Sequence, residues 1–314
     1  MGYALEHHVA VEDDVRRIMS EQLKKALKAL GTVDDEPAEA IYSARKRCKK
    51  IRGVARLVRP AMSGERYSKI NELARDAGRE LAPYRDATAM AETFDRVMEL
   101  ALASSVASDT RRSVRTALTD RGRALESEAA VENAAVTRAR KLLTELDDAI
   151  DGVELGDSGF DAIGSGVAKT YRRGRDALDV AGDAPTGANF HEWRKRAKYT
   201  RYHLDLLTPS APSIVAPMER GFHDLTDALG DAHDLVVLGE WFRSGPDEHL
   251  GDTTDLLVVI DGIRVELEHR AIALGRRLYA EPPKQFRKRL GAYWDVWSAE
   301  ESRSPAGDLE QVLG

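Results

Sequence analysis

The sequence predicts an all-α protein, and three features of its 314 residues support that prediction. Apolar residues recur at alternating steps of three and four along most of the chain, which is the spacing of one helix face. Runs with the alternating pattern of a strand are almost absent. Nearly all of the eleven prolines fall where a helical pattern starts or stops.

The bounds of the helices follow from these patterns and from the Gly and Pro residues between them. The second helix begins with Pro37 in its first turn, where a missing N–H costs nothing, and it ends before Pro60. Pro209, Pro212 and Pro217 predict a break later in the chain. The predicted helices cover residues 11–30, 37–59, 66–82, 86–104, 108–127, 129–151, 161–181, 189–208, 216–230, 233–243, 249–280 and the segment after Pro283.

The chain also repeats itself at an offset of 149 residues. The apolar positions of the second helix, shifted by 149, fall on an apolar row in the same phase, in which Cys48 corresponds to Ala197. Such self-similarity predicts two copies of one helical unit, each about 150 residues long. Asp86 and Asp234 also correspond at nearly this offset, and we expect both to be helix N-caps with a second role in orienting an arginine of the basic surface.

A row of cations lies beside the apolar row of the second helix. Between Arg45 and Arg59 there are eight Lys or Arg residues and no Asp or Glu. This segment carries +8 and the whole chain −6, so the remainder carries −14. A solvated helix normally interleaves the two signs, because i,i+4 ion pairs stabilise it and like charges destabilise it. The local excess of cations therefore predicts an anionic partner.

The second copy repeats this basic row. The offset places His191, Arg194, Lys198 and Arg201 against the first row, whereas Asp205 interrupts its end. One basic helix alone is usually a solvated face. Two in the same register within an acidic protein favour binding of a polyanion, since Arg donates two N–H groups to a phosphate and Lys acts as a point charge.

Three other interpretations compete with this one. Nucleic acid is also bound through its phosphates, but single-strand binding normally adds aromatic platforms, and the first basic helix offers only Tyr42. RNA therefore stays open as an alternative. His191 could accept a phosphoryl group, although its counterpart Tyr42 could not. Glu266 and His269 have the spacing of a di-iron helix, but no second Glu-x-x-His occurs, so we expect no metal.

The cysteine content and the lack of long apolar runs indicate where in the cell the protein is expected. The single cysteine, Cys48, lies on the apolar row and is expected to be a buried hydrophobic residue and not a nucleophile or ligand. No run of about 18 apolar residues occurs, so we expect a soluble, cytoplasmic protein with no membrane partner.

Several segments resemble the CHAD family, the conserved-histidine α-helical domains. Residues 191–202 (HEWRKRAKYTRY) resemble its signature helix, and residues 42–52 (YSARKRCKKIR) resemble the first copy of that signature. Residues 171–175 (YRRGR), 81–87 (LAPYRDA) and 228–235 (ALGDAHDL) extend the resemblance over nearly the whole chain. Tyr42 departs from the family, because it stands where the first copy would have a histidine.

The resemblance implies an architecture and a ligand. It implies two four-helix-bundle repeats, residues 1–155 and 156–314, related by a pseudo-twofold axis around a basic central channel. It further implies non-enzymatic binding of inorganic polyphosphate, with polyphosphate granules as a place of action. An accessory role beside triphosphate-processing enzymes is the alternative that the family suggests.

We therefore predict a site for inorganic polyphosphate, with no cofactor and no metal, and with nucleic acid as a disfavoured ligand. The candidate binding residues from the two basic rows are Arg45, Lys46, Lys49, Arg52, Arg56, His191, Arg194, Lys195, Lys198, Arg201 and Tyr202. The auxiliary candidates are Arg172, Arg173, Arg175, Lys24, Arg75 and Arg79.

Overall fold

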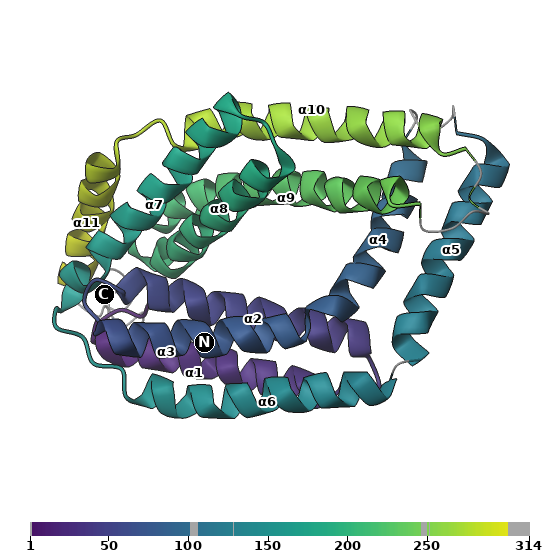
Figure 1. Ribbon diagram of the computed structural model, residues 1–314. Coiled ribbons are helices and arrows are strands. Elements are labelled where there is room, and N and C mark those ends of the chain that lie inside the picture. Colours follow the sequence, from purple (N-terminus) through teal and green to yellow (C-terminus); the bar gives the residue numbers. More distant parts are fainter. Residues whose placement is uncertain (1, 101–105, 128, 246–249, 251, 301–314) are drawn as a thin grey trace, which may run out of the picture.

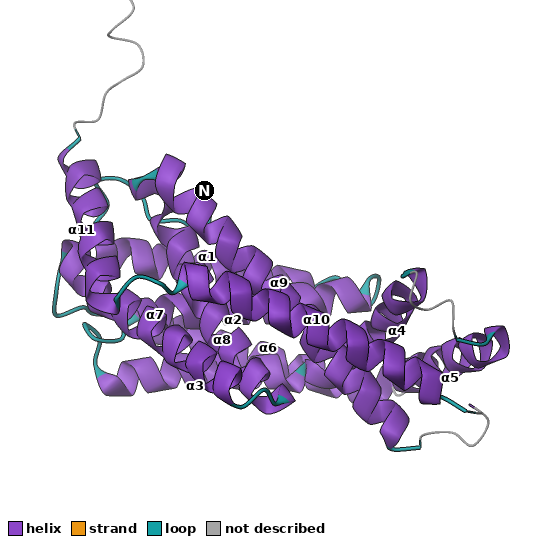
Figure 2. Ribbon diagram, turned by 90° about the horizontal axis from the view of Figure 1, so that it is seen from above, coloured by secondary structure: helices purple, strands orange, loops and turns teal. Residues whose placement is uncertain are grey.

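The computed structural model describes residues 2–100, 106–127, 129–245, 250 and 252–300, without the side chains of 83–89, 122–127 and 129–133. Within these ranges the chain is built from α-helices and contains no strand (Figure 2). One isolated antiparallel bridge joins Met62 to Leu155. The all-α prediction is thus confirmed. None of the described helices combines the length and apolar character needed to cross a bilayer.

The helices follow the predicted order. Their bounds are α1 (Val11–Leu30), α2 (Pro37–Val58), α3 (Gly64–Glu80), α4 (Ala82–Glu99), α5 (Ser108–Ser127), α6 (Ala129–Asp151), α7 (Gly159–Asp183), α8 (Gly187–Leu207), α9 (Pro212–Arg243), α10 (Thr254–Leu278) and α11 (Pro283–Ala299), with a 3₁₀ turn, η2 (Thr208–Ser210), between α8 and α9. Most boundaries lie within a few residues of the predicted ones. The predicted end of the fourth helix near residue 104 falls outside the described residues.

The prediction was wrong at α9, which is one helix of 32 residues and not two. Pro217 lies inside it and is exposed. Ser213, whose carbonyl loses its helical partner at Pro217, is also exposed, so water can satisfy that carbonyl. Asp234 lies inside α9 and is therefore not an N-cap. Asp86 is likewise inside α4, and its side chain is outside the described set.

Two hydrophobic clusters hold the helices together. The larger cluster joins α1, α2, α3 and α6 to α7, α8, α9 and α11 and includes the fully buried Trp193 and Cys48, of which Cys48 was predicted to be buried. The smaller one packs α4 and α5 against α9 and α10 around Phe94 and Leu238. In Figure 1 the helices accordingly form a frame, with α1, α2, α3 and α6 below and α7 to α10 above.

The helix bounds follow the offset of 149 residues. Shifted by 149, the bounds of α1 and α2 become 160–179 and 186–207, close to those of α7 and α8. The same shift sets α3 and α4 against the two ends of α9, and α5 against α10. The pseudo-twofold relation and the division at residue 155 stay predictions.

Candidate functional site

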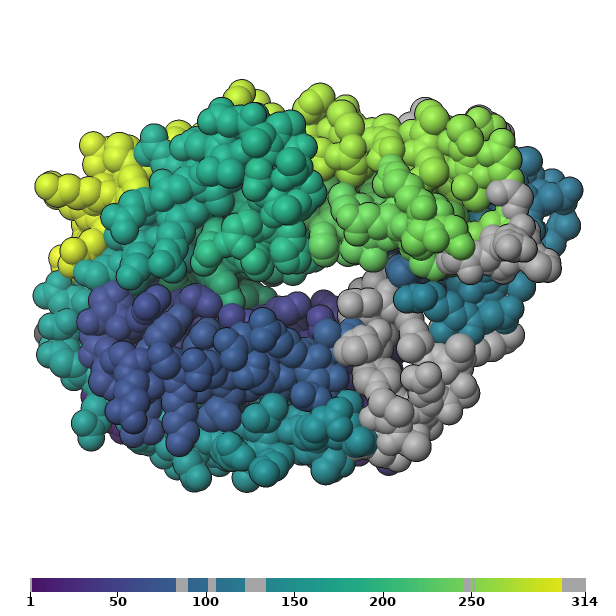
Figure 3. All heavy atoms as spheres, in the orientation of Figure 1, coloured from purple at the N-terminus to yellow at the C-terminus, as the bar shows by residue number. Residues whose placement is uncertain are grey.

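The two basic helices, α2 and α8, meet at a close contact. A Cβ atom at Gly53 on α2 would lie 3.1 Å from Cδ2 of Tyr202 on α8. His203 Nε2 lies 3.0 Å from the Gly53 carbonyl oxygen at the same crossing. Because the helices touch here, their rows of cations adjoin. The space-filling view shows the molecule hollowed between these lower and upper helices (Figure 3).

Six cations of these two helices act on one another through their charges and are called the central cluster: Arg45, Lys49 and Arg52 from α2, and Arg194, Lys198 and Arg201 from α8. Burial and the charges of Arg45 and Arg194 lower the pKa of Lys49 to about 8. Burial, Arg194 and Lys49 hold the pKa of Lys198 well below its usual range, although Asp227 opposes the shift. The two lysines are therefore crowded by like charge and poorly hydrated.

Neutral groups position Arg52 of the central cluster and its neighbour Arg56. Asn71 Oδ1 on α3 accepts from Arg52 Nε at 3.1 Å and from Arg56 Nη2 at 3.1 Å. The Tyr67 hydroxyl accepts from Arg56 Nη1 at 2.9 Å. These contacts fix the guanidinium groups while leaving their charge uncompensated. Arg201 differs, because its Nε lies 2.8 Å from Glu219 Oε1.

The guanidinium of Arg194 lies against Gly230 of α9, a residue that has no side chain. A Cβ atom at Gly230 would lie 3.0 Å from an Nη atom of Arg194, so glycine leaves room for the guanidinium. The Nε atom of Arg194 is buried and has no hydrogen-bond partner among the described residues. A buried donor without a partner is costly, so an acceptor supplied by a ligand would be favoured here.

Two histidines adjoin the central cluster. The rings of His191 on α8 and His233 on α9 lie 4.3 Å apart between centroids. Burial, His233 and Lys195 lower the pKa of His191 to about 4. Burial with Arg194 and Lys198 lowers that of His233 to about 4. Both imidazoles are therefore neutral at pH 7 and can donate one N–H each.

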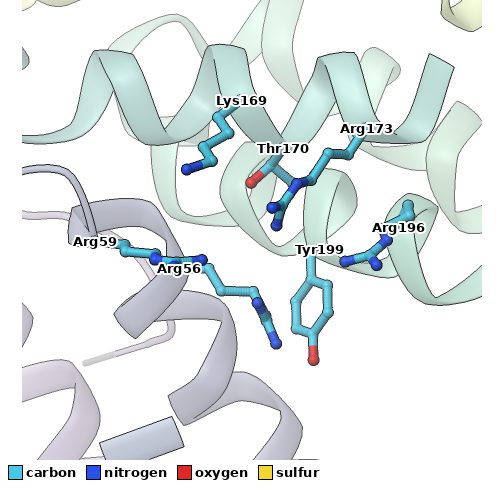
Figure 4. Close-up of a pocket in the computed structure, with 7 residues that line it drawn as sticks. All are labelled: Arg56, Arg59, Lys169, Thr170, Arg173, Arg196 and Tyr199. Atoms are coloured by element: carbon cyan, nitrogen blue, oxygen red, sulfur yellow. The ribbon is translucent and has the colours of Figure 1, made fainter. Parts of the chain in front are cut away.

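A pocket continues this surface beyond Arg56 and is called the end pocket. Its lining residues are Arg56, Arg59, Lys169, Thr170, Arg173, Arg196 and Tyr199. Figure 4 shows these side chains converging from α2, α7 and α8 on one space. The Arg56 guanidinium carbon lies 4.4 Å from the centroid of the Tyr199 ring, and that of Arg59 lies 4.4 Å from the Tyr67 ring. The pocket is therefore lined mainly by cations.

The other candidate residues are spread more widely. Lys46 and Lys195 are exposed, and Lys195 pairs with Glu192. Tyr202 is buried at the helix crossing. Of the auxiliary residues, Arg173 lies in the end pocket, and the others lie outside the central cluster and the end pocket: Arg172 is exposed, Arg175 is partly buried, Lys24 is exposed on α1, and Arg75 and Arg79 share the carboxylate of Asp76.

The structure adds residues that the sequence did not select. Lys169, Arg196 and Tyr199 line the end pocket, while Asn71 and Tyr67 position its arginines. Lys169 could have been found from its i,i+4 spacing to Arg173. The other four depend on which helices become neighbours. In the described part of the chain, no three His, Cys, Asp or Glu side chains group as metal ligands would.

Comparisons with known proteins agree with this architecture. The family model of the CHAD domain matches residues 17–243. PptA from Streptomyces chartreusis has a similar structure, with a TM-score of 0.58 and 14% identity over 88% of this chain and 99% of that one. A crystal structure of the CHAD domain from the plant Ricinus communis gives a TM-score of 0.57 and 13% identity over 96% of both chains. Among the curated proteins, no sequence matches.

Sequence identities this low show a shared fold and no more. The family assignment depends instead on the match over residues 17–243, which spans more than half of the chain. That match includes both basic helices, the central cluster and the end pocket. The chain belongs to the CHAD domain family.

Proposed function

We propose that this protein binds inorganic polyphosphate along the surface formed by the central cluster and the end pocket. The observation that supports this most directly is the crowding of Lys49, Arg194 and Lys198. Among the described residues, no carboxylate lies within ion-pair distance of these three cations. Gathering cations away from water is unfavourable unless an anion compensates them. A linear polyanion would supply that compensation along both helices.

A bare phosphate chain suits the surface better than RNA does. The aromatic residues at the site are already engaged, because Tyr199 is covered by Arg56 and Tyr202 is buried. Trp193 lies in the hydrophobic cluster. Bases would therefore find few platforms on which to stack, whereas phosphates need only cations and donors. CHAD domains as a family bind polyphosphate, which supports the same choice, and a cytoplasmic place of action near polyphosphate granules is part of the proposal.

We further propose that binding occurs without turnover, with His191 as a hydrogen-bond donor. The rival is phosphotransfer, and one observation favours it, because a neutral imidazole is the nucleophilic form. Turnover that disappears in His191→Ala while binding persists would establish the rival. Unchanged nucleoside triphosphate and polyphosphate after long incubation would support binding alone.

The decisive experiment is a competition between polyphosphate and nucleic acids of equal charge at the same salt concentration. We expect polyphosphate to bind more tightly than single-stranded RNA or duplex DNA. Lys198→Ala should weaken polyphosphate binding about tenfold, because one charge-assisted contact is lost. Lys141→Ala, an exposed cation on α6, is the matched control and should bind as the parent does. Equal or tighter binding of RNA would contradict the proposal.

A further inference from the structure

The charge of the end pocket is higher than an internal phosphate of a chain requires. Among the described residues, Arg56, Arg59, Lys169 and Arg173 have no carboxylate within ion-pair distance, while Arg196 pairs with Glu192. The charge of Arg59 is the largest cause of the lowered pKa of Lys169, ahead of burial. Burial, Arg196 and Arg59 likewise lower the pKa of Arg173. The pocket therefore concentrates repelling cations near one point.

The corresponding place in the other half of the chain is neutralised. The offset of 149 residues relates Arg56 to Asp205 and Tyr199 to Lys50. There Lys50 Nζ lies 3.3 Å from Asp205 Oδ2 and forms a salt bridge. The corresponding pair in the end pocket is Arg56 over the ring of Tyr199, which leaves the charge of Arg56 uncompensated. Glu219 compensates Arg201 beside it. The end pocket, the open end of the basic surface, is thus cationic, whereas its counterpart by the offset, called the paired end, is neutralised.

We infer that the end pocket binds the terminal phosphate of a polyphosphate chain, an inference that rests on the proposed function. An internal phosphate carries one negative charge and is linked on both sides. A terminal phosphate carries up to two charges at neutral pH and presents three acceptor oxygens, as a phosphate monoester does. A pocket of uncompensated cations beyond the central cluster fits the end group, which carries more charge than an internal phosphate.

The pocket can also satisfy the oxygens of such a group. Arg173 and Arg59 offer forked N–H donors from α7 and from the end of α2, and Lys169 adds an ammonium. Thr170 lines the same pocket and can donate a hydroxyl proton. Arg56 belongs to this pocket and also shares Asn71 with Arg52 of the central cluster. A chain whose end lies in the pocket would therefore continue along α2 toward Lys49.

The test compares two linear polyphosphates of the same defined length at about pH 8, one with free ends and one whose terminal phosphates are both methyl esters. Esterification removes the second charge at each end and leaves internal phosphates unchanged. The parent protein should bind the free-ended chain about tenfold more tightly. This preference should disappear in Arg173→Ala and in Lys169→Ala, while Lys141→Ala should keep it. Circular dichroism checks that each variant stays helical.

The outcomes separate this inference from the proposed function. If the parent binds both chains tightly and equally, the terminal site is wrong and polyphosphate binding stands. If the parent binds neither chain, the proposed function itself is wrong. A pyrophosphate titration distinguishes a polymer end from a small phosphate. Binding of pyrophosphate as tight as that of the free-ended chain would overturn the inference, whereas weak competition that Arg173→Ala removes would support it.

Discussion

At the scale of one residue, the lowered pKa of Lys49 shows that the free protein lacks an anion at this position. Burial, Arg45 and Arg194 lower its pKa to about 8, against about 10.4 for an unperturbed lysine. Because the folded pKa is lowered, protonation of Lys49 favours the unfolded chain. This destabilisation is fully present below about pH 8 and disappears as pH rises toward the unfolded pKa. A bound phosphate would reverse the shift by favouring the charged ammonium.

We therefore predict opposite effects of Lys49→Met on stability and on binding. The free variant should be more stable than the parent at pH 7 by about 1–3 kcal/mol, because a crowded cation is replaced by an apolar side chain of similar length. It should bind polyphosphate about tenfold more weakly. Thermal unfolding and titration calorimetry measure the two effects. A variant that loses both stability and affinity would show that Lys49 is a structural residue.

The same residue gives the binding reaction a pH dependence. Below about pH 8 Lys49 is already protonated, so this residue takes up no proton on binding there. Above that pH the parent must take up a proton to bind, and its affinity should fall by up to about tenfold per pH unit until the pKa of the bound state is passed. Lys49→Met should show a smaller fall than the parent between about pH 8 and 10, because the proton uptake of Lys49 is lost. Calorimetry in two buffers of different ionisation enthalpy counts the protons directly.

At the scale of elements, the contact between α2 and α7 builds the end pocket. Gly166 on α7 lies so close to α2 that a Cβ atom would be 1.7 Å from the carbonyl oxygen of Leu57. Only glycine allows this approach, and it brings Lys169 and Arg173 opposite Arg56 and Arg59. The short distance between α2 and α7 therefore determines how closely the cations of the end pocket are packed.

Gly166→Ala should force α2 and α7 apart. We expect a loss of stability of about 1–3 kcal/mol or more, since the added methyl group meets backbone and not a movable side chain. The preference for free chain ends should weaken as the cations separate. Gly182→Ala on the same helix is the control, because nothing lies within 4 Å of its Cβ position and the exposed residue lies in the last turn of α7, so stability should change by less than about 0.5 kcal/mol. Equal unfolding temperatures for the two variants would contradict the role given to Gly166.

The helices were largely predictable because their signals are local. The apolar row through Cys48, the proline at the start of α2 and the basic row through Arg52 all lie within one segment. The unbroken α9 was not predictable from Pro217, since a proline interrupts a helix only where its missing hydrogen bond cannot be replaced. That condition depends on exposure, which the sequence does not specify.

At the scale of the whole molecule, the candidate site was predicted only in part. The sequence identified the cations on α2 and α8 because each row has the helical period. Lys169 has i,i+4 spacing to Arg173, but the sequence could not show that Lys169 or Asn71 lies beside these cations, because the packing of α7 and α3 against α2 joins segments far apart in the chain. It also treated Arg52 and Arg201 as equivalent, whereas the fold gives them different neighbours.

That difference predicts unequal salt dependence. Arg52 bonds the neutral Asn71 and keeps its charge for the ligand, while Arg201 is compensated by Glu219. If binding mainly releases condensed counterions, Arg52→Ala should lower the slope of log K against log salt by roughly one unit or less, by analogy with nucleic acids. Arg201→Ala should lower it by less. Glu219→Gln should raise both affinity and slope, because it frees Arg201 to contact phosphate.

Titrations of the three variants at several salt concentrations measure these slopes. Equal slopes for Arg52→Ala and Arg201→Ala, with no gain in Glu219→Gln, would mean that the ligand does not distinguish the open end of the basic surface from the paired end.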